Sequence, residues 1–211
     1  MDTTPDRKNS SAMLYLSLGA SLGLILLTAF QWSLAEWLAM PLILPVAWLF
    51  FVVMGVLTIQ KIDHSERQGR SAAYPFVVWV LAAVVMLVVP FTQWTLELDY
   101  HLHKTARVAV IARLLDGSLK PDSDSADYST SLRLGRDMPT VSKGGNVIEV
   151  QKHEGDGYYV FFYTFLGLLD NYSGFLYVPD GADPRQFWDF TDPSEAWLVQ
   201  YDENWYWVSH R

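Results

Sequence analysis

Cysteine is absent from the sequence, and charged residues are absent from long stretches of its first half. The missing thiols exclude disulfides, thiol catalysis and a cysteine-ligated zinc site. No charged residue lies between Arg70 and Glu97, and Glu36 is the only one between residues 9 and 60. Stretches of this length without charge are typical of membrane spans. The first half is therefore expected to be membrane-embedded.

Three apolar runs in this half, at about residues 13–30, 37–59 and 74–91, are predicted to be transmembrane helices. The second run exceeds, and the other two approach, the roughly 20 residues that a helix needs to cross a hydrocarbon core. A cleaved signal peptide is disfavoured, because the first run is long for one and no Ala-x-Ala-like site precedes Trp32. None of the runs has an ionisable residue in its apolar core, which argues against a transporter. Residues 1–94 are thus predicted to be a tail and a three-helix membrane anchor.

Lysine and arginine are distributed asymmetrically around these runs. Arg7 and Lys8 precede the first run, three further basic residues lie within 61–70, and the 31–36 loop has none. By the positive-inside rule, the N-terminus and the loop before the third run are cytoplasmic, and three crossings place the rest of the chain outside. The expected location is a bacterial cytoplasmic (inner) membrane, with an extracytoplasmic C-terminal domain.

The first run contains Gly19 and Gly23, the Gly-x-x-x-Gly spacing that lets two membrane helices approach closely. Packing against the other two spans is the simpler interpretation of these candidate helix-packing residues. Formation of a homo-oligomer through the membrane helices is the alternative.

Acidic residues are concentrated after the last run. Residues 97–211 hold 18 of the 23 acidic and 10 of the 15 basic residues, a net charge of −8. Proteins bind nucleic acid by placing Lys and Arg against phosphates, so no nucleic-acid partner is expected. An acidic domain suits a basic partner, or simply solubility.

Residues 95–211 are predicted to form a soluble α+β domain with one helix and an antiparallel sheet of about five strands. In the helix, Leu102, Val108 and Leu115 recur at near-helical spacing, with Arg107 on another side. Alternating or aromatic-rich runs predict strands at 146–151, 158–165 and 174–178, and hairpin arms at 196–201 and 205–209.

Two segments of this domain resemble a pattern in uncharacterised bacterial membrane proteins. One is F-x-G-x-L-D-N-x-S-G-F-x-Y, from Phe165 to Tyr177, and the other is the N-W-Y-W-V-S hairpin segment, from Asn204 to Ser209. No activity is attached to that pattern. The resemblance therefore implies a bacterial origin and a domain boundary, but no chemistry.

Candidate ligand sets for metals are weak. His101 and His103 would share a face only on an extended segment, where Asp99 could join them around Zn²⁺. The acidic loop 122–127 lacks the glycine and the distal glutamate of an EF-hand. Many carboxylates follow residue 170, but no nucleophile elbow accompanies them. No metal, cofactor or catalytic residue is therefore predicted.

Aromatic residues are unusually dense near the C-terminus, with 17 of them between Tyr158 and Trp207. A domain of this size has more aromatic side chains than its core needs, and the surplus could contact a protein, a glycan or lipid headgroups. The candidate binding surface consists of Trp197, Tyr201, Trp205, Trp207 and Trp188.

The sequence as a whole favours a non-catalytic envelope protein that is embedded in the lipid bilayer. Its exported domain would bind a partner protein or cell-wall material. A membrane-bound immunity protein against an exported toxin, an envelope-acting hydrolase and a sensor remain as alternatives.

Overall fold

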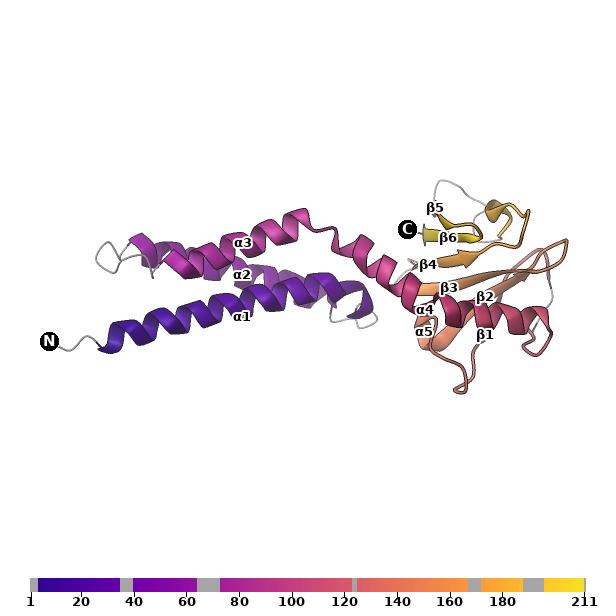
Figure 1. The fold of residues 1–211 in the computed structure, drawn as a ribbon, viewed down its shortest axis with the longest axis horizontal. Coiled ribbons are helices and arrows are strands. Elements are labelled where there is room, and N and C mark those ends of the chain that lie inside the picture. The colour runs from indigo at the N-terminus through magenta and orange to yellow at the C-terminus, as the bar shows by residue number, and fades with distance from the viewer. Residues whose placement is uncertain are drawn as a thin grey trace. The chain divides into compact units, whose positions relative to one another are not determined.

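The computed structural model describes residues 4–34, 40–63, 73–122, 125–166, 172–187 and 196–210 (Figure 1). The chain divides into two compact units, Met1–Thr95 and Leu96–Arg211, which we call the N-terminal and C-terminal units.

The N-terminal unit consists of helices, and α1 contacts both of the helices that follow it. Its small core contains Leu24, Phe51 and Ala82. Trp79 stacks on the ring of Phe51 with 5.4 Å between centroids, and its Nε1 donates a 2.9 Å hydrogen bond to the carbonyl oxygen of Phe51. The helices are α1 (Thr4–Leu34), α2 (Met40–Asp63) and α3 (Tyr74–Val88).

This unit buries polar side chains and exposes large apolar ones, which is the opposite of a water-soluble helical bundle. The hydroxyl-bearing residues Ser17, Ser21 and Thr58 are buried. Large apolar side chains are exposed on all three helices, for example Leu22, Leu49, Val52, Leu81 and Leu87.

By length and composition, one helical stretch among the described residues could cross a membrane, Ala12–Phe30 near the N-terminus. A second qualifies only if α3 and the next helix, which form a bent pair, count as one span. The apolar stretch Pro45–Gln60 of α2 is shorter. The described residues therefore provide one or two candidate spans where the sequence predicts three. A signal sequence or a buried core helix also has this length and composition.

The helix α3 ends at Val88, three residues before the predicted end of the third span. Val89 has the extended φ and ψ of −82° and 120° because Pro90 disfavours helical geometry in the residue before it. The next helix, α4 (Phe91–Leu115), begins immediately after this proline. The boundary predicted at residue 91 is therefore corrected to Val88.

The C-terminal unit is an α+β domain with a single antiparallel sheet of six strands in the order β1-β2-β3-β4-β6-β5. The sequence predicts about five of these strands. The missed strand is β1. It has only four residues, too few for a clear alternation in the sequence, and it pairs with β2. The strands are β1 (Thr130–Arg133), β2 (Val147–Lys152), β3 (Tyr158–Leu166), β4 (Tyr172–Tyr177), β5 (Ala196–Asp202) and β6 (Trp205–His210).

Two short elements also belong to the described part of the unit. The turn α5 (Lys143–Asn146) holds Gly144 and Gly145 at positive φ, and the 3₁₀ turn η2 (Pro184–Gln186) is capped by Asp183.

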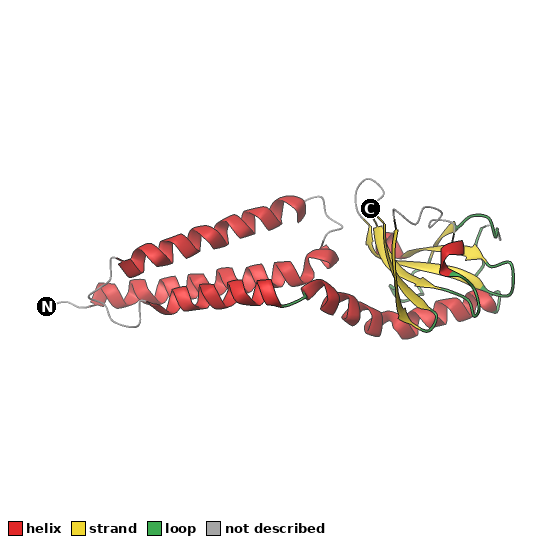
Figure 2. Ribbon diagram, turned by 90° about the horizontal axis from the view of Figure 1, so that it is seen from above, coloured by secondary structure: helices red, strands yellow, loops and turns green. Residues whose placement is uncertain are grey.

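The sheet has a core on each face, and α4 covers one of them (Figure 2). Ile148, Val160, Phe162 and Phe175 point toward the helix and are fully buried. On the opposite face, a second cluster is closed by Phe187 at the end of η2. It contains Tyr159, Phe161, Leu176, Val178, Phe187 and Val208.

The helix α4 faces the sheet with a side that its apolar spacing does not predict. Arg107, Val110 and Leu114 are buried against the sheet, whereas Leu102 and Leu115 are exposed. The interpretation of Arg107 as part of a separate polar side is therefore corrected.

Candidate binding surface

Strand β5 lies at one edge of the sheet and exposes two large apolar side chains. Trp197 is 63% exposed, and Val199 lies two residues further on the same face. No charged side chain occurs in β5 before Asp202. Edge strands usually have charges or prolines that discourage pairing with other chains, so this edge is suited to contact with another molecule.

Other members of the predicted aromatic surface lie elsewhere. Trp205 is only 4% exposed and packs on Phe162 and Tyr177, with ring centroids 5.8 and 5.5 Å away. Trp207 is half-buried against the same core, and its indole Nε1 is buried without a hydrogen-bond partner. Trp188 lies outside the described residues. Trp205 therefore contributes to the core and is not available for contact.

Tyr201, the remaining candidate, joins β5 to α4. Its ring lies 4.9 Å from that of Tyr100, and its hydroxyl donates to the carboxylate of Glu97. Burial and the Glu97 carboxylate raise the pKa of Tyr201. This side chain attaches the helix to the sheet beside the exposed part of β5.

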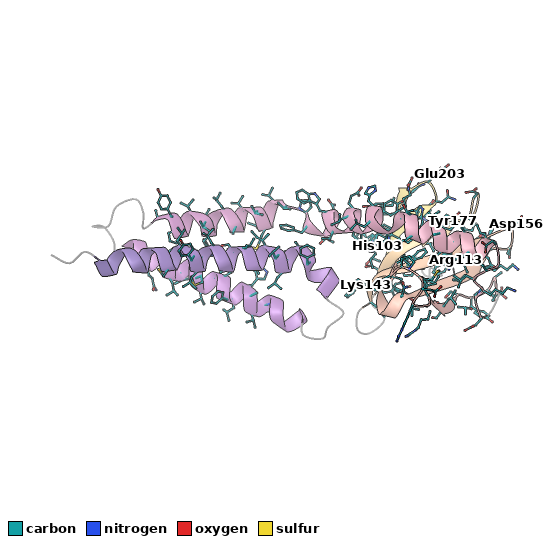
Figure 3. The ribbon with its side chains drawn as sticks, turned by 60° about the horizontal axis from the view of Figure 1, so that its bottom comes forward. His103, Arg113, Lys143, Asp156, Tyr177 and Glu203 are labelled. Atoms are coloured by element: carbon teal, nitrogen blue, oxygen red, sulfur yellow. The ribbon has the colours of Figure 1, made fainter. Side chains whose placement is uncertain are left out.

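Asp202 at the end of β5 accepts hydrogen bonds from two residues of α4, Tyr100 and Lys104 (Figure 3, where Glu203 marks the adjoining turn). The hydrogen bond from the Lys104 ammonium is the main reason why the pKa of Asp202 is lowered to about 2. Burial, followed by the hydrogen bond to Asp202, raises the pKa of Tyr100 to about 12. These contacts fix α4 to the β5–β6 hairpin through a charged group.

Among the described residues of the unit, Arg107 of α4 is a buried charged residue, 1% exposed, whose side chain lies against the sheet. Its Nη2 lies 2.6 Å from Asp99, and its Nε donates a 3.1 Å hydrogen bond to the carbonyl of Val141. The guanidinium also lies 5.7 and 5.0 Å from the ring centroids of Phe162 and Phe175. Burial lowers the pKa of Arg107, and Asp99 opposes that shift.

The histidine pair does not converge on one site. His101 lies 2.8 Å from Glu97 and His103 lies 3.1 Å from Asp99, each one turn back along α4. Over the part of the chain that the structure describes, no group of three His, Asp or Glu residues could hold a metal ion. Asp124 of the acidic loop falls outside that part.

The carboxylates after residue 170 have local structural contacts where they are described. Asp183 accepts from the backbone N–H of Arg185, and Asp180 accepts from the amide of Asn204. Asp170, Asp189, Asp192 and Glu195 lie outside the described residues.

Gly19 and Gly23 are not in the packed interior of the N-terminal unit. A Cβ added at either position meets no atom within 4 Å. Gly55 differs, because a Cβ there would lie 2.4 Å from the ring of Trp79. Gly55 is therefore the glycine that the contact between α2 and α3 requires.

Sequence reasoning missed Tyr100 and Arg107, which link α4 to the sheet. The available signal was their spacing of seven residues, which places both on one side of a helix together with Leu114. An arginine on that side is ordinarily interpreted as exposed.

No family model, no curated protein and no solved structure matches this chain. Its function is therefore inferred from the residues and contacts described above.

Proposed function

We propose that this chain is a non-catalytic integral membrane protein of the bacterial envelope, whose C-terminal unit is exported and binds a partner protein. The observation that carries the proposal is the apolar exterior of α1, α2 and α3. Large exposed aliphatic side chains surround a core that includes buried serine and threonine. Water penalises such a surface, whereas hydrocarbon does not.

The three helices serve as three spans in this proposal. The basic residues before the first span and within 61–70 keep those segments in the cytoplasm. An odd number of crossings then exports the C-terminal unit.

The exposed part of β5 is the proposed contact surface for the partner. An edge strand can pair with a strand from another chain. In such a complex the main-chain hydrogen bonds supply affinity, and every second side chain along the strand supplies specificity. In β5, Trp197 and Val199 are exposed on one face and would supply this specificity. Aromatic anchors of this kind often dominate the binding energy of an interface.

Cross-linked affinity capture from native membranes, followed by mass spectrometry, tests this function. The full-length wild type is compared with Trp197→Ala/Val199→Ser and with a control, Gln200→Ala, which changes an exposed residue on the other face of β5. We expect a stoichiometric protein partner that the double variant loses and the control retains. Recovery of the same partner by all three proteins would reject β5 as the surface, and recovery of cell-wall glycan alone would reject a protein partner.

A further inference from the structure

Two serine hydroxyls are buried inside the N-terminal unit and have no hydrogen-bond partner among the described residues. Ser17 is 3% exposed and Ser21 is 5% exposed, and the Oγ atom of each is unpaired. They lie one turn apart on α1, on the side that also places Leu24 in the core. Buried hydroxyls in proteins are normally hydrogen-bonded, because an unpaired one has lost its hydration without compensation. These two hydroxyls therefore require a partner.

Two threonine hydroxyls of the same unit are instead paired with their own helices. Thr28 donates a 2.8 Å hydrogen bond to the carbonyl oxygen four residues earlier, and Thr58 donates a 2.7 Å hydrogen bond to the carbonyl oxygen three residues earlier. Serine and threonine side chains in helices commonly make this bond. Ser17 and Ser21 do not make it, which leaves both hydroxyls to a group in the interior between the helices.

Thr58 of α2 lies at the same level of the unit as Ser17. Leu24 and Phe51 belong to one core cluster, and α1 and α2, which contact each other, run in opposite directions (Figure 1). Ser17 precedes Leu24 by seven residues along α1. Thr58 follows Phe51 by seven residues along α2, so both hydroxyls lie two turns from the cluster in the same direction. Thr58 is 3% exposed, and its oxygen can still accept a hydrogen bond.

Water fits these hydroxyls better than a cation or another side chain does. Cation sites in proteins use carboxylates or several carbonyl oxygens, and the three apolar runs contain no acidic, basic or histidine residue. A side chain from another protein would have to enter an interior in which these residues are at most 5% exposed. Water both donates and accepts hydrogen bonds, and it commonly occupies buried sites that offer it about two to four polar partners.

We infer that the N-terminal unit holds a buried water molecule that bridges Ser17 and Ser21 and also bonds to Thr58. Side chains four residues apart on a helix have Cβ atoms about 5–6 Å apart, a separation that two hydrogen bonds of about 2.8 Å can span when they meet at one water. The third bond joins α1 to α2. The water thereby fixes the rotation of α1 against α2, because hydrogen bonds are directional and apolar contacts are not.

Water-edited solid-state NMR of the full-length protein in lipid bilayers tests the inference. Magnetisation that starts on water reaches the nearest protein protons first. Its build-up at the three hydroxyl-bearing residues is therefore compared with its build-up at Leu24, which is 2% exposed in the same unit. We expect it to be several-fold faster at the hydroxyl-bearing residues. Build-up as slow as that at Leu24 would overturn the inference, because the hydroxyls would then be paired within the protein.

A double variant, Ser17→Ala/Ser21→Ala, removes two of the three partners of the water. Build-up at Thr58 is expected to fall to the level at Leu24. The melting temperature in detergent is expected to fall by several degrees, because hydrogen bonds are lost. Unpaired hydroxyls predict the opposite, since their removal would raise the melting temperature, and that result would overturn the inference.

The matched control is Thr28→Val, which removes a hydroxyl that is bonded to its own helix. It should leave the build-up at Thr58 unchanged. The wild-type comparison decides the question even if the double variant does not fold. Neither measurement depends on the partner proposed for β5, so failure of this inference is distinguishable from failure of the proposed function.

Discussion

Individual side chains decide how α4 is held on the sheet, and most of the decisive ones are polar. Tyr100 and Lys104 both reach Asp202, while Arg107, paired with Asp99 of the same helix, lies against the rings of Phe162 and Phe175 in the sheet. The first contact is at the surface, where solvent weakens an ion pair, and the second is buried, where loss of one partner leaves an uncompensated charge. The two contacts are therefore expected to respond differently to substitution.

The Asp202 contact is expected to give the C-terminal unit a dependence on pH at both extremes. The pKa of Asp202 in the folded chain is about 2, below its ordinary value of about 3.9. Its contribution is therefore complete above about pH 4 and is lost as the pH falls through about 2. Tyr100 has a raised pKa of about 12, so its contribution is complete below about pH 10 and is lost as the pH rises through about 12.

Replacing Asp202 with asparagine is expected to lower the urea midpoint at pH 7, with a difference from wild type that shrinks as the pH falls from about 4 to about 2. The full chain is titrated with urea in micelles, and pulsed hydrogen exchange follows the protection of the backbone amides of residues 196–210. The measured quantity is the urea concentration at which half of this protection is lost. A difference that persists unchanged at pH 2 would contradict the ion pair as its cause.

Replacing Asp99 with asparagine is expected to destabilise the C-terminal unit by roughly 1–3 kcal/mol, because the buried guanidinium loses its charged acceptor. Arg107→Met in the same chain should recover part of that loss, since an apolar side chain of similar length suits the site between Phe162 and Phe175. The control, Asp137→Asn, changes an exposed pair that is 3.9 Å apart and should alter stability by less than about 0.5 kcal/mol. The same urea titration measures all three, and equal effects at Asp99 and Asp137 would contradict the prediction.

At the scale of elements, strand positions were predictable where the sequence alternates locally, and facing directions were not. The runs that contain Ile148 and Phe162 form strands as predicted. Trp197 and Trp205 have the same kind of local pattern, yet one is exposed and the other buried, because β6 is internal and β5 is at the edge. Strand order is a long-range property that no local pattern contains. The helix α4 was oriented wrongly for a related reason: it is apolar on two sides.

The three glycines of α1 and α2 are expected to differ in their tolerance of alanine. Gly55→Ala should destabilise the N-terminal unit by about 1–3 kcal/mol, because the added Cβ displaces Trp79 from Phe51. Gly19→Ala and Gly23→Ala should leave the stability of the monomer unchanged, since each Cβ enters open space. Thermal unfolding of the detergent-solubilised chain ranks the variants, and greater sensitivity at Gly23 than at Gly55 would contradict this packing. A loss of cross-linked oligomer in Gly23→Ala would instead support association of chains through α1.

In the proposed membrane arrangement, the number of crossings sets the side of the membrane on which the C-terminal unit lies. With a cytoplasmic N-terminus, one or three crossings export this unit and two retain it. The proposed three spans and the single span Ala12–Phe30 therefore agree on location, and a two-span arrangement with α3 and α4 as one bent span does not. A measurement of sidedness consequently tests the proposed architecture directly.

Single cysteines in the cysteine-free chain provide that measurement. An impermeant maleimide applied to intact spheroplasts is expected to label Ser131→Cys, in exposed β1 of the C-terminal unit. Ser65→Cys, which lies among the basic residues between the second and third predicted spans, is expected to react only after lysis. The reverse pattern would place the C-terminal unit in the cytoplasm and remove the export on which the proposed function depends. Labelling of both sites in intact spheroplasts would exclude three spans but keep the unit outside, because a single crossing exposes everything after the first helix.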